Sequence, residues 1–204
     1  MRATAVVLAA GASSRFGAQK LLADLAGLPV LQHVLDAAAS AGLGNVVVVL
    51  GDAAPDVEAA ISWRGERRVV NPRPGDGLSS SLRIGLAAAA EDHGAEAAIV
   101  LLGDQPAVRA AAIEAVLAAA GTTDRTFVRA RYARDGAPNP VVVRRDAWPE
   151  AMAATGDRGL GPLLAARPDR VHAVDVDGAN PDVDTPADLE RLARHEPAFV
   201  EARP

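Results

Sequence analysis

The chain has 204 residues, a formal net charge of −5 and a pI near 5.4. This length supports one α/β domain with a sizeable core, and the negative charge argues against binding nucleic acid or an anionic membrane by bulk attraction. The absence of cysteine excludes disulfides, thiolate nucleophiles and cysteine-type zinc sites. Because no signal-peptide pattern and no bilayer-length apolar run is present, we expect a cytoplasmic protein with no membrane partner.

Short apolar runs alternate with helical patterns along the chain. Seven runs predict strands, at residues 4–10, 45–51, 67–70, 97–103, 126–132, 140–144 and 171–176. Helices are predicted between several of them, at residues 29–41, 55–63 and 79–90. This rhythm predicts right-handed βαβ units and an α/β fold, a three-layer sandwich around a mostly parallel, Rossmann-like sheet. We expect a single domain over residues 1–204, with residues 196–204 forming a frayed tail.

The first predicted strand runs into a loop that carries glycine and two cations. It ends Leu8-Ala9-Ala10, and the loop then contains Gly11, Ser13, Ser14, Arg15, Gly17 and Lys20. A glycine turn at the carboxyl end of a strand lets backbone N–H groups approach a phosphate, and the two cations add positive charge there. Lys20 is the only lysine among 21 basic residues, which indicates a need for an ammonium at this position. The alternative is a solvated surface lysine.

Three common glycine motifs do not fit this loop. A P-loop requires contiguous Gly-Lys-Ser/Thr, but two residues separate Gly17 from Lys20. Ser13 stands at the second glycine of the dinucleotide fingerprint, and Arg15 stands at the last glycine of the nucleophile elbow. The loop therefore predicts a site for a small anionic ligand outside these three classes.

Further polar residues follow other predicted strands, whose carboxyl ends should share one edge of the sheet. Gly77 and Ser79–Ser81 mark a predicted helix start, where serines can cap the helix and free N–H groups favour an anion. Asp104 directly follows the predicted strand at residues 97–103. It could serve as a Mg²⁺ ligand or as a turn residue.

The segment after the last predicted strand holds two more carboxylates. If it is extended, Asp182 and Asp184 point to one face. Thr185 and Asp188 form a helix start, a capping Thr with an acid three residues later, and are predicted to be structural. Asp182 and Asp184 can then bind a metal, although Asp184 could also be a turn residue, and spacing does not decide between the two.

Together these segments resemble the MobA-like nucleotidyltransferases, with the molybdenum-cofactor cytidylyltransferase (MocA-like) proteins as the nearest subgroup. The family signature L-A-A-G-x-S-x-R-F-G-x-x-K-L-L matches residues 8–22, and G-x-x-x-S-L matches residues 77–82. L-x-D-x-P matches residues 102–106, and D-x-D-T-P-x-D-L matches residues 182–189. The match is looser in two segments that contact the acceptor in the family. Asn139 replaces the His of G-H-P, and Gly161 replaces the Arg of G-D-x-G-A-R.

The resemblance implies Mg²⁺-dependent transfer of a nucleoside monophosphate from an NTP to a phosphomonoester, with release of pyrophosphate. It implies that the catalytic residues are Arg15, Lys20 and Asp104. The nucleotide would be bound by Leu8, Ala9, Ala10, Gly11, Ser13, Ser14, Arg15, Lys20, Gly77, Ser80 and Ser81. The metal would be held by Asp104 with Asp182 or Asp184, and the acceptor would be contacted by Asn139, Pro140 and Gly159.

The base and the acceptor are less constrained. Relatives that use GTP carry A-G-G where this chain has Ala9-Ala10-Gly11, and the methyl group of Ala10 narrows the slot beside the base, which favours CTP. By analogy the acceptor is a molybdopterin-type cofactor, which a molybdoenzyme would then receive. The alternatives are guanylyl transfer and a sugar, polyol or phospholactate-type phosphate as acceptor.

Two other classes of protein remain open. An NAD(P)-dependent oxidoreductase is disfavoured by the missing G-x-G-x-x-G. A non-catalytic nucleotide-binding module or cofactor chaperone would keep Arg15 and Lys20 but would not need the carboxylates Asp104, Asp182 and Asp184.

Overall fold

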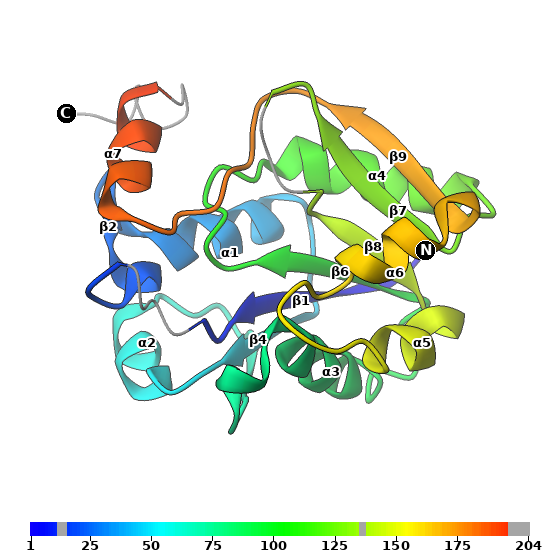
Figure 1. Ribbon diagram of the computed structural model, residues 1–204, viewed down its shortest axis with the longest axis horizontal. Helices are drawn as coiled ribbons and strands as arrows, with labels where there is room; N and C mark the ends of the chain where they lie inside the picture. The colour runs from blue at the N-terminus through cyan, green and yellow to red at the C-terminus, as the bar shows by residue number, and fades with distance from the viewer. Residues whose placement is uncertain (12–15, 135–137, 196–204) are drawn as a thin grey trace.

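The computed structural model describes residues 1–11, 16–134 and 138–195 (Figure 1). Within these residues one seven-stranded sheet has the order β5-β4-β1-β6-β8-β7-β9. Its strands are β1 (Ala3–Ala9), β4 (Val46–Leu50), β5 (Arg67–Val70), β6 (Ala97–Leu102), β7 (Phe127–Tyr132), β8 (Val141–Arg144) and β9 (Val171–Val176). Strand β8 is antiparallel to both of its neighbours and the other pairs are parallel, so the remaining six strands share one carboxyl edge.

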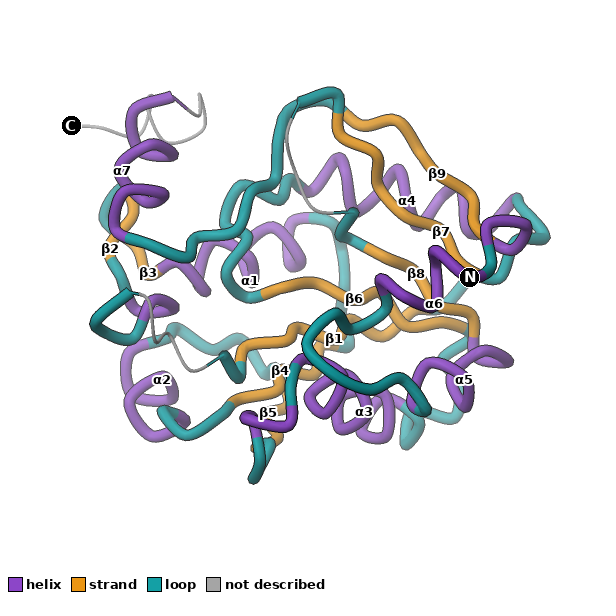
Figure 2. Tube along the Cα trace, in the orientation of Figure 1, coloured by secondary structure: helices purple, strands orange, loops and turns teal. Residues whose placement is uncertain are grey.

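Helices cover both faces of the sheet, which confirms the predicted three-layer α/β fold (Figure 2). One face packs against α1 (Val30–Ser40), α2 (Ala54–Ala60) and α4 (Ala110–Thr122). The other face packs against α3 (Leu78–Ala89), α5 (Trp148–Met152) and α6 (Gly161–Ala166). Helix α7 (Pro186–His195) and a short hairpin of β2 (Asp24–Leu25) and β3 (Leu28–Pro29) lie beside this sandwich and contribute to a small third cluster.

The central strands are apolar along their whole length because they are covered on both sides. Strands β1, β4 and β6 are almost continuously buried, as expected for parallel strands between two helical layers. Helix α3 comes especially close to β1, since a Cβ at Gly85 would clash with the side chain of Val6. This close approach places the start of α3 beside the carboxyl end of β1.

The predicted elements agree with the structure to within a few residues. Helix α2 is shorter than predicted and ends at Ala60, because Ile61 adopts an extended backbone. The reversed direction of β8 and the β2–β3 hairpin were not predicted. The predicted frayed tail at residues 196–204 lies outside the described residues. In the described parts of the chain, no helix has the length and apolar character needed to cross a membrane.

Candidate active site

Lys20 lies at the centre of a charged cluster at the carboxyl edge of the sheet. It begins a short 3₁₀ helix (Lys20–Leu22) after the β1 loop, and only 8% of its surface is exposed. Its Nζ lies 2.6 Å from Oδ2 of Asp104 and 3.0 Å from Oδ1 of Asp184. The structure therefore brings together three predicted residues from three distant segments.

The two carboxylates keep the Lys20 ammonium charged. Burial alone would lower the pKa of Lys20, but the attraction and hydrogen bonds of Asp104 and Asp184 outweigh it and raise this pKa above its ordinary value. A buried lysine whose charge is held in this way can meet an anionic ligand at the edge of the sheet.

Asp182 and Asp184 have different partners in the structure. Val183 between them is fully buried, and its N–H donates to the carbonyl of Asp104 at 2.9 Å. Asp184 faces Lys20, whereas Oδ1 of Asp182 accepts a hydrogen bond from Nε2 of Gln105 at 2.8 Å. Burial and the nearby Asp104 carboxylate raise the pKa of Asp182.

The carboxylates suit a divalent cation that is completed by substrate. Asp104 and Asp184 both contact the ammonium of Lys20, so their oxygens already face one position that holds a positive charge. Within the described residues, no group of three or more acidic or imidazole side chains could hold a metal. Because Mg²⁺ usually takes one or two carboxylates together with substrate phosphates and water, this donor set fits Mg²⁺.

A chain of amide side chains stands behind the carboxylates, and the sequence analysis missed it. Oε1 of Gln105 accepts from Nδ2 of Asn180 at 3.1 Å, and the same Nδ2 lies 3.2 Å from the carbonyl oxygen of Asn139. Both amide residues are buried, with exposures of 1% for Gln105 and 0% for Asn180. The chain therefore connects Asp182 to the predicted acceptor segment. Gln105 stands out in the sequence because it follows Asp104, but nothing in the sequence indicates that Asn180 is its partner.

The start of α3 is organised differently from the prediction. No serine caps the helix; Gly77 is the N-cap residue, and no side chain makes a capping bond. The hydroxyls of Ser80 and Ser81 instead accept from Nδ2 of the buried Asn71, at 2.7 and 3.0 Å. Gly77 has a φ of +91°, and a Cβ there would lie 2.5 Å from Oδ1 of Asp157, so glycine is required.

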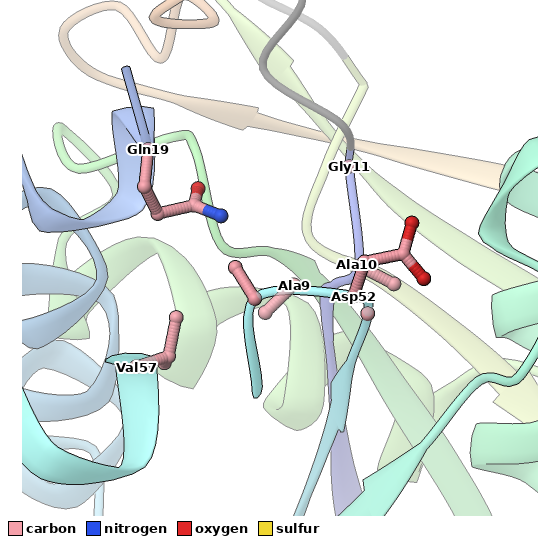
Figure 3. A pocket seen from close by; sticks show the side chains of 8 residues that line it. Ala9, Ala10, Gly11, Gln19, Asp52 and Val57 are labelled. Atoms are coloured by element: carbon pink, nitrogen blue, oxygen red, sulfur yellow. The ribbon is translucent and has the colours of Figure 1, made fainter. Parts of the chain in front are cut away.

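Part of the predicted nucleotide loop lines a small pocket of about 100 Å³. Figure 3 shows Ala9, Ala10 and Gly11 at this pocket, with Gln19 pointing in from the side opposite Asp52. The end of β4 closes against β1 here, because a Cβ at Gly51 would lie 2.6 Å from the carbonyl oxygen of Ala10. Gln19 and Asp52 were not predicted.

A second cavity, of about 280 Å³, lies under the predicted acceptor segment. Asn139 and Gly159 line it, together with Leu8, which was predicted to contact the nucleotide. Most of its other lining side chains are apolar, namely Leu78, Leu82, Val100, Leu102, Val141, Leu160 and Leu164. Pro140 is buried next to this cavity, and its carbonyl accepts from Ala130 N–H.

The remaining predicted residues of the β1 loop, Ser13, Ser14 and Arg15, lie outside the described residues. The described part of the site thus comprises the Lys20 carboxylate cluster, the start of α3 and two cavities along one edge of the sheet.

The family model of the MobA-like NTP transferase domain matches residues 5–171, from β1 to the start of β9. The chain belongs to this family. The matched region holds Lys20, Asp104 and both cavities, whereas Asp182 and Asp184 lie just beyond it.

Individual relatives are similar over different extents. The phosphoenolpyruvate guanylyltransferase of Sphaerobacter thermophilus is 31% identical over 171 residues, covering 83% of this chain and 80% of that protein. The bifunctional protein GlmU of Bordetella petrii is 34% identical over 118 residues, but the match spans only 26% of its length. Among solved structures, the manganese complex of Rv0371c from Mycobacterium tuberculosis is 31% identical, with a TM-score of 0.81 over 96% of this chain and 100% of that chain.

Proposed function

We propose that this protein is a Mg²⁺-dependent nucleotidyltransferase that moves a nucleoside monophosphate, CMP from CTP in the first instance, onto a phosphomonoester acceptor. The observation that carries the proposal is the convergence of Lys20, Asp104 and Asp184 at the edge of the sheet that also holds the pocket of Ala9 and Ala10. A cation beside converging carboxylates is what a triphosphate with its metal ion requires.

The chemistry requires positioning and charge neutralisation more than a nucleophilic side chain. An oxygen of the acceptor phosphate forms a bond to the α-phosphorus of the NTP, and the bond from this phosphorus to pyrophosphate breaks. The acceptor is already an anion near pH 7, so no general base is needed. Lys20 and Arg15 would hold the triphosphate oxygens.

The metal would be held by Asp104 and Asp184. Asp182 is the other candidate ligand in this segment, and Gln105 donates a hydrogen bond to its Oδ1. The bound Mg²⁺ would supply screening of the phosphate charge. The manganese complex of the Rv0371c relative supports a divalent cation in this family.

The two cavities favour a pyrimidine base and a planar acceptor. The pocket at Ala10 is small, about 100 Å³, and therefore suits the smaller bases. The cavity at Asn139 and Gly159 has mainly apolar walls, which suit a flat ring system such as molybdopterin better than a sugar with many hydroxyl groups to satisfy. A molybdoenzyme would then receive the product.

Guanylyl transfer is the second candidate. It is favoured by the similarity to the guanylyltransferase of Sphaerobacter thermophilus, which aligns over most of both chains. Acceptors of the sugar, polyol or phospholactate type belong to the same alternative.

A thermal-shift panel tests the proposal, with CTP, GTP, UTP, ATP, NADH and NADPH, each with and without Mg²⁺. A ligand at a hundred times its Kd adds about 2.7 kcal/mol, which corresponds to about 5–10 °C for a domain of this size. The expected result is a Mg²⁺-dependent shift that is largest with CTP, followed by pyrophosphate release when an acceptor is added. A shift with GTP alone would support the second candidate. Nucleotide binding without turnover on any acceptor would indicate a carrier, and a shift only with NADPH would contradict nucleotidyl transfer.

A further inference from the structure

A third cavity, of about 440 Å³, lies between α6 and the sheet face formed by β7 and β9. Figure 2 shows α6 beside this end of the sheet. The described lining is Arg129 from β7, Val171 and Ala173 from β9, Gly161, Leu164 and Ala165 from α6, and Pro138 and Pro168 from the adjoining loops. Arg129 is the only charged group in this lining. The cavity shares Pro138, Gly161 and Leu164 with the second cavity, and it shares no described residue with the Lys20 carboxylate cluster.

Arg129 is half-buried and has no hydrogen-bond or ion-pair partner among the described residues. Two residues further along β7, on the same face, Arg131 makes a bidentate pair with Asp175, with N–O distances of 2.5 and 2.7 Å. The strand register explains the difference. Asp175 stands opposite Arg131 on β9, whereas Ala173 stands opposite Arg129.

The other neighbouring strand does not supply a carboxylate either. Val141 of β8 stands opposite Arg129. A partly dehydrated guanidinium loses hydrogen bonds to water, and its planar fork fits a carboxylate or phosphate. The cavity therefore presents a cation whose N–H groups have no protein acceptor among the described residues, and apolar side chains surround it.

We propose that this cavity is a binding site for a small organic anion, whose carboxylate or phosphate pairs with Arg129 while its apolar body lies on Leu164, Ala165 and Pro168. The anionic group would take the place that Asp175 takes beside Arg131. The apolar walls select against a bare inorganic anion, because they offer it no hydrogen bonds.

The test uses the full chain without nucleotide or metal, and four probes titrated by calorimetry. Phenyl phosphate and benzoate carry both the anionic group and the apolar body. Inorganic phosphate carries the charge alone, and benzyl alcohol carries the ring alone. Saturable binding of phenyl phosphate or benzoate, and weaker binding of the other two, is expected; comparison of these two ligands identifies the preferred anionic group.

Three variants locate the binding. Arg129→Gln removes the cation, and Ala173→Asp places a carboxylate opposite Arg129 in the register of Asp175; each should weaken binding by about tenfold or more. Arg131→Gln is the matched control on the same strand and face, and it should leave the affinity within about twofold, since an exposed paired cation contributes little.

Two outcomes would overturn the proposal outright. The first is the absence of saturable binding of either aromatic anion at millimolar concentration. The second is equal affinity of the wild-type chain and Arg129→Gln. Inorganic phosphate that binds as tightly as phenyl phosphate would refute the apolar part of the site. None of these results depends on nucleotidyl transfer, so the two proposals can fail separately.

Discussion

Strands β4, β1 and β6 lie between two complete helical layers, while β7 and β9 at the far edge are covered fully on one face only. On the first face of β7 and β9, Val128, Ala130 and Val176 join the large core cluster. The other face carries Arg129, and the exposed pair Arg131 and Asp175. Strands β1, β4 and β6 contain a single polar residue, Thr4, whereas β7 and β9 carry polar residues along their length.

This difference separates two kinds of binding surface. The Lys20 carboxylate cluster follows the ends of strands that are held rigidly by packing, which suits a site where charges must be positioned closely. The Arg129 cavity lies on a strand face that α6 covers incompletely. A ligand can fill such a surface without disturbing the core. Single substitutions in the two regions test this contrast.

The largest effect is expected at Asp104, which follows β6 in the central part of the sheet. Asp104→Asn keeps the size of the side chain and an oxygen for Lys20, but removes the charge that would hold Mg²⁺. We expect kcat for pyrophosphate release to fall by about 1,000-fold or more, since metal stabilisation of the transition state is worth several kcal/mol. Unchanged circular dichroism would show that the fold is intact, and near-normal turnover would refute the metal assignment.

The unequal coverage of the two halves predicts unequal costs of truncation. Ile99 of β6 is fully buried, whereas Val174 of β9 is only partly buried. Ile99→Ala should lower the free energy of unfolding by about 2–5 kcal/mol, and Val174→Ala by about 1 kcal/mol. Urea denaturation measures both values. Equal losses would mean that the edge strands are packed as tightly as the centre.

The same contrast explains how far the sequence predicted the fold. The central strands are nearly continuous apolar runs, so their positions and their parallel direction follow from hydrophobic patterning and the βαβ rhythm. The reversal of β8 could not be predicted in this way, because Val141–Arg144 is an apolar run whose direction depends on how the preceding loop returns to β6.

The charged residues of the candidate site were predicted from the sequence. The buried hydrogen bonds between its polar side chains were predicted less well. Lys20, Asp104 and Asp184 were chosen from the sequence, and the structure places them in contact. The amide chain through Gln105 and Asn180 was missed, because buried hydrogen-bond partners 75 residues apart leave no periodic signal. The α3 serines were predicted as caps, but Asn71 binds two of their hydroxyls instead.

Gln105 offers a way to loosen the site without removing a carboxylate. Gln105→Leu would free Asp182 and Asn180 from their shared partner, so the carboxylate could turn away from the metal. We expect Mn²⁺ to bind about 10–100-fold more weakly in a calorimetric titration with a non-hydrolysable nucleotide, as is typical when a partner that orients a ligand is lost.

A matched variant distinguishes the loss of Asp182 orientation from a general loss of protein stability. Gln32 of α1 is another buried glutamine, 3% exposed, and it is bonded to Asp36 and Ser62, neither of which belongs to the Lys20 carboxylate cluster. Gln32→Leu should lower the melting temperature in a similar way and leave the Mn²⁺ affinity unchanged. If both variants weaken Mn²⁺ binding equally, Gln105 has no positioning role.

The smallest effect is expected at α7, which lies outside both halves of the sheet. The capping pair predicted from the sequence is present: Oδ2 of Asp188 accepts from Thr185 N–H at 2.8 Å, and Thr185 Oγ1 accepts from Asp188 N–H at 3.2 Å. The hydrogen bonds from Thr185 lower the pKa of Asp188 to about 2, well below the ordinary value of an aspartate. Asp188→Asn should therefore destabilise the protein by about 1 kcal/mol at neutral pH.

The pH dependence of that loss follows from the sign of the shift. A carboxylate whose folded pKa is depressed stabilises the fold fully above its unfolded pKa, and this stabilisation is lost as pH falls through the folded value. The gap in unfolding free energy between the wild-type chain and Asp188→Asn should hence be constant above about pH 4 and shrink between about pH 4 and 2. Asp124→Asn, at a side chain that is 98% exposed, is the control and should show no such gap. A gap at Asp188 that persists unchanged to pH 2 would mean that the stabilisation does not depend on the carboxylate charge, and no gap at any pH would mean that the amide caps α7 as well as the acid does.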